Sequence, residues 1–248
     1  MARRALLLAT SLLVATSFLV SSTLAEETSG GSLFDESDLA IRRIEGFCNT
    51  YLLTCKRTKR FAVVDPCPEA VSAILRHAQA GHTLGAIWIT HEHGDHLAGL
   101  APLKEKVEAQ ALGHAKTQAY LEKIASAGAW DWTDEKGDPL PKPPKLDRIV
   151  ADGDSVTVGK LTWKVRHVPG HSPGSIAFVL GDRYAVVGDV LFSGSVGRTD
   201  LETSDPDRFC RSLSEVLWDL PDKVVVLPGH MKTTTIGKEK KSNWLFQD

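Results

Sequence analysis

The sequence contains little cysteine, with four residues in 248, at positions 48, 55, 67 and 210. This number is too small for disulfide bonds to be the main support of a fold of this length. If segments 47–55 and 60–67 form a hairpin, Cys48 lies opposite Cys67. A Cys48–Cys67 disulfide and a pair of free buried thiols are therefore both compatible with the sequence.

An excess of positive charge is also absent. Lysine and arginine number 29 against 31 acidic residues, which gives a net charge of −2, and no basic stripe with interleaved aromatic residues occurs. A nucleic-acid-binding surface is therefore not expected. The densest basic segment, 237–241, is interpreted as a solvated terminal segment.

We expect a small molecule as the substrate, and the sequence does not predict an oligomeric state.

Long apolar runs are missing except near the N-terminus. There, residues 5–25 carry no charge, follow two arginines, and end in small and polar residues that include Thr23 and Ala25. This pattern predicts a secretory signal peptide over residues 1–25, cleaved after about Ala25. A permanent membrane anchor is the weaker alternative because the run does not end in apolar residues. We expect the mature protein to be exported, periplasmic or secreted, and to have no membrane contact.

Internal repeats and low-complexity tracts are absent as well. After a linker over residues 26–38, the segment 39–248 is long enough for one domain with a sizeable core. The proline-rich and charged segment 134–145 predicts a surface loop within this domain rather than a boundary between two cores.

What the sequence does contain is a dense histidine motif, THEHGDHLAG, at residues 90–99. It follows GAIWIT, an apolar run that predicts a buried strand over 85–90, and precedes a segment with helical spacing over 97–107. In open α/β sheets, ligands bind outside the carboxyl ends of strands, so this position favours binding over an ordinary polar surface. The metal-capable residues of the motif are His91, His93, Asp95 and His96.

Three later apolar runs also end in glycine-containing turns that carry one metal-capable residue each. The run 161–168 leads to His171, the run 183–192 contains Asp189, and the run 223–230 ends at His230. Each residue alone could be an ordinary turn residue or helix cap. Together, the four strand ends bring seven donors toward one face.

The chemistry of these donors indicates a metal site. Zinc and similar ions bind imidazole nitrogen and carboxylate oxygen, and a catalytic ion keeps one position open for water. Seven donors exceed what one four-coordinate ion needs, and the surplus fits two ions about 3.5–4 Å apart. The two oxygens of Asp189 can bridge such a pair. We expect two divalent ions, with zinc as the first choice and iron or manganese as alternatives.

The motif HEHGDH resembles the H-x-H-x-D-H signature of the metallo-β-lactamase superfamily, and PGH, GD and a second PGH follow in that family's order. The resemblance covers about residues 39–248. It implies an α/β fold, the αβ/βα four-layer sandwich, in which two mixed β-sheets face each other with helices outside. It also implies a first metal held by His91, His93 and His171, a second held by Asp95, His96 and His230, and Asp189 as the bridge.

Within the superfamily, three segments are similar to the glyoxalase II group, the hydroxyacylglutathione hydrolases, and especially to its short bacterial members. These segments are VVDP at 63–66, GDVLFSGSVGRTDL at 188–201 and TTIGKEKKSN at 234–243. In that group a glycine and then a cation that meets glutathione follow the bridging aspartate, and Gly197 and Arg198 match that place. Full-length glyoxalase II has a helical extension with further glutathione contacts, and such contacts are not expected here because the related SNWLF segment is followed by Gln247 and Asp248.

The sequence therefore predicts an exported metal-dependent hydrolase in which a metal-bridging hydroxide attacks a thioester such as a hydroxyacylglutathione. Asp95 is predicted to orient the hydroxide as well as bind metal, and Arg198 to bind substrate. His167 is either a support behind the ligands or an ordinary strand-end residue. β-Lactam hydrolysis is not expected, because true β-lactamases often have Cys or Ser at the place of Asp189.

Three alternatives stay open or are set aside. Persulfide dioxygenases resemble this sequence, share the G-R-T-D motif at 197–200, and use one iron bound by two histidines and the aspartate. A hydrolase of another ester, amide or lactone would use the same ligands. A catalytically silent binding module is disfavoured because no ligand of the set is missing.

Overall fold

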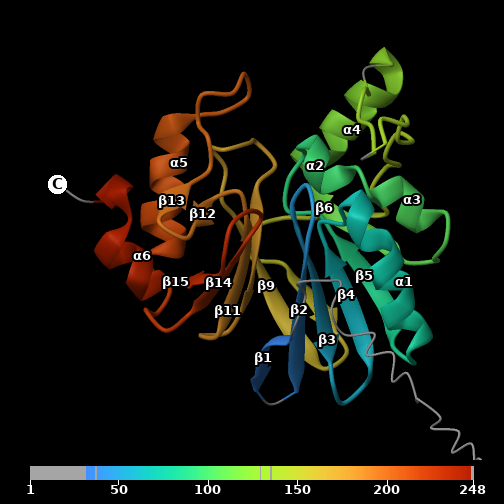
Figure 1. The fold of residues 1–248 in the computed structure, drawn as a ribbon. Helices are drawn as coiled ribbons and strands as arrows, with labels where there is room; N and C mark the ends of the chain where they lie inside the picture. The colour runs from blue at the N-terminus through green and yellow to red at the C-terminus, as the bar shows by residue number, and fades with distance from the viewer. Residues whose placement is uncertain (1–31, 37, 129, 135, 247–248) are drawn as a thin grey trace, which may run out of the picture.

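Two mixed β-sheets packed face to face, with helices on both outer faces, make up the protein (Figure 1). The computed structural model describes residues 32–36, 38–128, 130–134 and 136–246. The predicted signal peptide, 1–25, and most of the predicted linker, 26–38, lie outside the described residues. Within the part of the chain that is described, no helix has the length and apolar character needed to cross a membrane.

The first sheet has its seven strands in sequence order. They are β1 (Ser32–Glu36), β2 (Leu39–Glu45), β3 (Asn49–Cys55), β4 (Arg60–Val64), β5 (Thr83–Trp88), β6 (Gln110–His114) and β7 (Arg148–Val150). Strands β1 to β4 pair antiparallel and β4 to β7 pair parallel. The helical segments of this half are η1 (Pro68–Ala70), α1 (Val71–Gln79), α2 (Gly94–Leu97), α3 (Leu100–Lys104) and α4 (Ala115–Ala127).

The second sheet has six strands in the order β15-β14-β11-β10-β9-β8. They are β8 (Ser155–Val158), β9 (Leu161–His167), β10 (Ile176–Leu180), β11 (Tyr184–Gly188), β14 (Val225–Pro228) and β15 (Thr234–Thr235). A small hairpin joins β12 (Leu191–Phe192) to β13 (Ser195–Val196). The helices of this half are α5 (Pro206–Ser212), the π-helix η2 (Leu213–Leu217), α6 (Ile236–Ser242) and the 3-10 helix η3 (Trp244–Phe246).

Three apolar clusters separate the four layers. The central one joins both sheets and includes Trp88, Trp163 and Phe178, with the rings of Trp88 and Phe178 4.7 Å apart. The other two pack the first sheet against α1, α3 and α4, and the second sheet against α5 and η2. Apolar side chains on both faces of the central strands explain why strands such as β10 and β11 are continuously buried. The predicted αβ/βα sandwich with two mixed sheets is confirmed.

One predicted helix is wrong in detail. The segment 97–107 forms parts of two short helices, α2 and α3, that are interrupted around Gly99. The backbone N–H of Gly99 donates to the carbonyl oxygen of Pro66 at 2.9 Å, and a Cβ at this position would lie 2.4 Å from that oxygen. This close approach needs glycine, and it ties the histidine motif to the end of β4.

The hairpin considered for segments 47–55 and 60–67 is present, with Cys55 paired to Arg60 and Tyr51 to Val64. All four cysteines lie in the described residues and are free thiols, with Cys210 exposed and the other three buried. Of the two alternatives for Cys48 and Cys67, the structure has the buried thiols.

Candidate metal centre

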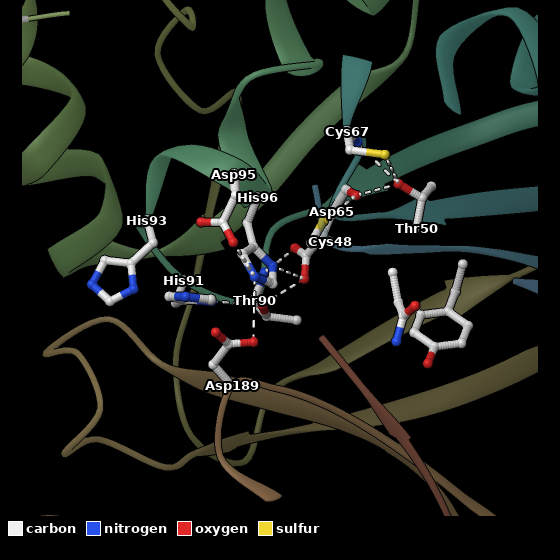
Figure 2. Close-up of polar contacts among 12 residues, drawn as sticks. Cys48, Thr50, Asp65, Cys67, Thr90, His91, His93, Asp95, His96 and Asp189 are labelled. Atoms are coloured by element: carbon white, nitrogen blue, oxygen red, sulfur yellow. Dashed lines mark hydrogen bonds and ion pairs between the residues drawn. The ribbon is translucent and has the colours of Figure 1, made fainter. Parts of the chain in front are cut away.

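Seven side chains from four strand ends meet at one edge of the sandwich, and Figure 2 shows His91, Asp95, His96 and Asp189 close together there. They form two groups, and within each group one ligand atom per residue lies within 4.8 Å of the others. The first group is His91, His93 and His171, and the second is Asp95, His96, Asp189 and His230. The structure thus brings together every metal-ligating residue predicted from the sequence.

The first group consists of three imidazoles from two loops. His91 and His93 follow β5, and His171 lies in the turn between β9 and β10. His171 Nε2 lies 2.8 Å from His93 Nδ1, and the ring centroids of His91 and His93 are 4.7 Å apart. These nitrogens converge on one point and can serve as three ligands of a tetrahedral ion.

The second group combines two carboxylates with two imidazoles. His230 Nε2 lies 3.1 Å from Asp95 Oδ2, and His96 Nε2 lies 3.3 Å from Asp189 Oδ1. The other oxygen of Asp189 lies 3.3 Å from His230 Nε2 and 3.7 Å from His171 Nε2. Asp189 therefore contacts both groups, which is the position that a bridging carboxylate needs.

Three buried polar atoms of these groups have no hydrogen-bond partner. They are His91 Nε2, His96 Nε2 and Asp189 Oδ1, and the latter two face each other across 3.3 Å without hydrogen-bond geometry. Buried polar atoms are almost always satisfied, so unpaired ones gathered at one point indicate a missing partner. Imidazole nitrogens and carboxylate oxygens are the donors that zinc and similar divalent ions take, so these residues fit a metal pair.

The first group is electrically neutral. Burial lowers the pKa of His91 well below its usual value, and burial together with His171 lowers the pKa of His93 to about 4. Burial also lowers the pKa of His171. Neutral imidazoles keep a lone pair available, which is the state that binds a metal ion.

The second group carries charges of both signs. Hydrogen bonds to Asp189 and Asp95 raise the pKa of His230 to about 9. Burial opposes the charge on His96, but Asp189 and Asp95 outweigh it and raise the pKa of His96 well above its usual value. Burial would raise the pKa of both carboxyls, yet the neighbouring histidines lower both. Without metal, two protons therefore balance two carboxylates.

Metal binding to the second group is expected to release about two protons per chain near neutral pH, because the ion replaces the protons on His96 and His230. Since both pKa values are raised, affinity should increase with pH from neutrality through about 9, where His230 loses its proton. Calorimetric titrations in buffers of different ionisation enthalpy measure the release, and His230→Ala should release about one proton fewer. Equal heats in all buffers would contradict the predicted charge state.

Asp65 is a supporting residue that sequence analysis missed. It follows β4, is 2 % exposed, and its Oδ2 lies 2.9 Å from His96 Nδ1 and accepts a hydrogen bond from Thr90 Oγ1 at 2.6 Å. Its Oδ1 accepts from the backbone N–H of Thr90 at 2.7 Å. A carboxylate on Nδ1 fixes the tautomer in which Nε2 faces the metal position. An acidic residue directly after a buried strand was the available signal, the same one that marks Asp189.

Side chains of the first sheet hold the turn that carries His230. Asn49 Nδ2 and Tyr51 Oη donate to the carbonyl oxygen of Pro228 at 2.9 and 2.8 Å, and the backbone N–H of Asn49 donates to Gly229 at 2.6 Å. A Cβ at Gly229 would lie 2.1 Å from Asp189 Oδ1. The glycine of this PGH turn therefore allows His230 to approach the bridging carboxylate.

Glu92 holds the other PGH turn. It lies between two ligands of the histidine motif and is 6 % exposed. Its Oε1 accepts from the backbone N–H of Gly174 at 3.0 Å, and its Oε2 accepts from Thr117 Oγ1 at 3.2 Å. The buried carboxylate thereby connects the motif to the turn that positions His171.

Comparison with known proteins agrees with this fold. The family model described as the metallo-beta-lactamase superfamily matches residues 43–230, which contain all seven donors. The chain belongs to the metallo-β-lactamase superfamily. This superfamily binds divalent metal ions, and its members include hydrolases.

Three proteins that are similar to this chain have different named activities or families. The hydroxyacylglutathione hydrolase GloC of Haemophilus influenzae is 30 % identical over 75 % of this chain and 86 % of its own length. The BLEG-1 B3 metallo-beta-lactamase is 31 % identical, with a TM-score of 0.71, over 81 % of this chain and 95 % of that one. ETHE1 from Myxococcus xanthus is 29 % identical, with a TM-score of 0.65, over 82 % and 83 %.

Arg198, the predicted substrate contact, reaches the ligands of the candidate metal centre through its backbone. Its carbonyl oxygen lies 2.8 Å from His171 Nδ1, so it orients that ligand. Its side chain is 68 % exposed and makes two hydrogen bonds to Asp200, at 2.9 and 3.0 Å. The structure therefore places the guanidinium at the surface, where Asp200 partly neutralises it.

His167 lies behind the turn rather than among the ligands. Its Nε2 lies 3.0 Å from the carbonyl oxygen of Pro173, and its ring stacks on His114 with centroids 4.2 Å apart. Of the two interpretations left by the sequence, these contacts favour a support for the turn that carries His171.

Proposed function

We propose that this protein hydrolyses a thioester, with a hydroxyacylglutathione as the type substrate, at a pair of divalent metal ions. The observation that carries the proposal is the complete set of seven donors in two adjoining groups with Asp189 between them. One group offers only neutral imidazoles and the other also offers carboxylates, so the two ions would have different ligands. The similarity to GloC supports the thioester among the possible acyl substrates.

The protein side chains would divide the work of the reaction. Divalent ions bound by these groups would supply Lewis-acid chemistry, lowering the pKa of a bound water and polarising a carbonyl oxygen. His91, His93 and His171 would hold one ion, while Asp95, His96 and His230 would hold the other. Asp95 has a 20 % exposed side chain against 10 % for Asp189, so it is the carboxylate that can accept a hydrogen bond from an attacking water.

Hydrolysis in this arrangement needs no serine or cysteine nucleophile. Water adds to the thioester carbonyl carbon, the carbon–sulfur bond breaks, and the products are a carboxylic acid and a thiol. A thiolate is a good leaving group because thiols have a pKa near 8.5, so no dedicated acid is required.

We also propose that the chain acts after export, and detection of the mature protein outside the cytoplasm would test this.

Arg198→Ala is expected to raise KM for an anionic thioester by about tenfold and to change kcat much less, because an exposed contact made equally in the ground and transition states is uniform binding. The backbone carbonyl that orients His171 remains in the variant. Asp200→Asn is the matched control, since it frees the guanidinium and should lower KM. Steady-state kinetics measure both, and a reduced kcat at unchanged KM would place Arg198 in the chemistry instead.

The proposed reaction is tested by comparing metal forms of the same protein. The zinc-loaded form should cleave S-D-lactoylglutathione or another small thioester measurably, and the iron-loaded form should consume no oxygen when glutathione persulfide is supplied. Zinc has no redox chemistry, so the two assays separate hydrolysis from dioxygenation. Metal-free protein is the control for both.

Two outcomes would overturn the proposal. Rapid oxygen uptake without thioester turnover would identify a persulfide dioxygenase and leave the ligand assignments intact. Turnover of a β-lactam, lactone, ester or amide, with no thioester cleaved, would keep the hydrolase and replace its substrate class.

A further inference from the structure

Two buried cysteines, Cys48 and Cys67, lie close to Asp65 near the metal centre (Figure 2). Cys48 precedes β3 and Cys67 follows β4, so each lies just beyond the paired residues at the same end of the hairpin. Their exposed fractions are 1 % and 0 %. The remaining cysteines are elsewhere, with Cys55 at the other end of the hairpin and Cys210 exposed on α5.

The two thiols lie opposite each other at the end of the hairpin and are connected through shared polar partners. The register that pairs Tyr51 with Val64 places Cys48 opposite Cys67, and Cys48 Sγ donates to the carbonyl oxygen of Asp65 at 3.5 Å. Thr50 Oγ1 lies 2.6 Å from that oxygen and 3.4 Å from Cys67 Sγ. The backbone N–H of Cys67 donates a hydrogen bond to Thr50 Oγ1 at 2.9 Å. The sulfurs thus belong to one network centred on the Asp65 backbone.

Asp65 connects this network to the metal ligands. Its φ of +48° lies in the left-handed region that a non-glycine residue adopts only when its surroundings impose it. Its carboxylate simultaneously contacts His96 and Thr90. A covalent bond between the flanking cysteines would therefore act on the residue that orients His96.

We propose that Cys48 and Cys67 form a redox-active dithiol whose oxidation to a disulfide fixes the Asp65 turn beneath His96. With hydrogen peroxide as oxidant, Cys67 attacks one peroxide oxygen and becomes a sulfenic acid, with loss of one water. Cys48 then attacks that sulfur and releases a second water. The pair loses two electrons and two protons, and peroxide is reduced to two waters.

The surroundings assign the first step to Cys67. A hydrogen bond from Cys48 lowers the pKa of the Cys67 thiol, whereas burial and the same hydrogen bond raise the pKa of Cys48 well above its usual value. Both sulfurs are buried, so peroxide reaches them when the end of the hairpin opens locally. The thiolate is the reactive form of cysteine, so Cys67, with the lowered pKa, then reacts first and Cys48 resolves the product.

The disulfide would close a loop over residues 48–67, the length of the β3–β4 hairpin. Closing a loop of this size restricts the unfolded chain, and we expect the melting temperature of metal-free protein to rise by roughly 5–10 °C on oxidation. In the zinc-loaded protein, oxidation should slow loss of metal to a chelator, because the support of His96 can no longer shift.

The experiment first alkylates exposed Cys210 in the native protein and then compares peroxide-oxidised with reduced samples. Mass spectrometry after denaturation should show a single cross-link between Cys48 and Cys67, with Cys55 still alkylatable. Cys48→Ser should lose the cross-link, the shift in melting temperature and the slower metal loss. Cys55→Ser is the matched control, since it removes another buried thiol of the same hairpin and should retain all three.

A dithiol that survives peroxide, or a cross-link to another cysteine, would overturn the assignment of the pair. A Cys48–Cys67 disulfide that leaves the rate of zinc loss unchanged would overturn its coupling to His96. The chemical mapping and the melting temperature do not depend on the substrate, so they stand apart from the proposed hydrolysis.

Discussion

Asp189→Ala is expected to lower bound metal from about two ions per chain to one or none. It should also reduce thioester hydrolysis by more than about 100-fold, because losing a ligand costs more than losing one of its supports. The carboxylate contacts His96, His171 and His230 through its two oxygens, and it is 8 % exposed. No neighbouring side chain can supply the lost oxygens. Metal analysis of protein purified without added metal gives the stoichiometry.

A control for this variant lies at the other end of the same strand. Asp182 precedes β11, is exposed, and pairs with Lys223 at 3.8 Å. Asp182→Ala should keep both ions and full activity, and circular dichroism of both variants checks that the fold is retained. Two ions per chain in Asp189→Ala would rule out the bridging arrangement.

Asp65→Asn is expected to weaken binding of the second ion by about 10–100-fold, which is the usual effect of removing the partner of a metal-binding histidine. The carboxylate accepts three hydrogen bonds, from His96 Nδ1, Thr90 Oγ1 and the Thr90 backbone N–H. An amide has one oxygen, so either orientation turns an NH2 group toward a donor. The tautomer of His96 that leaves Nε2 free for metal is then no longer favoured.

Competition with a chromophoric chelator measures the affinity of Asp65→Asn for zinc. Asp38→Asn provides the comparison, because Asp38 is an exposed carboxylate that pairs with Arg57 away from the ligands. If Asp65→Asn binds its second zinc as tightly as the unaltered protein, the orientation of His96 does not depend on this carboxylate.

The ligands could be predicted because each follows an apolar run that can be recognised in the amino-acid sequence. Runs of β-forming residues that end in HEHGDH, PGH or GD put their polar residues at the same edge of a sheet, and the structure has them there. Asp65 gave the same signal at the end of β4, but its importance depends on His96 and Thr90, which lie more than twenty positions away. The role of a residue that acts through another residue can be recognised only once the structure shows the contact between them.

Other features depended on contacts between distant segments. The interruption of the helical segment at Gly99 follows from the approach of Pro66, and Asn49 and Tyr51 act on a turn of the opposite sheet. Sequence spacing predicts which face of an element is apolar, but it does not predict which backbone carbonyl a polar side chain will meet. The pairing of Arg198 with Asp200 was likewise not predicted, because two charged residues two positions apart in a loop can adopt many relative orientations.

The division of the donors between the two sheets sets the order in which the centre can be completed during synthesis. The first group is present once residue 171 has left the ribosome, whereas the second also needs His230, which is 135 positions after its partner Asp95. The turn that carries His230 is itself held by β3, near the beginning of the domain. The second group therefore cannot be complete before residue 230 has been synthesised, so its ion cannot be fully bound before the ligands of the first group are present. Once bound, that ion adds its binding free energy to the docking of one sheet on the other.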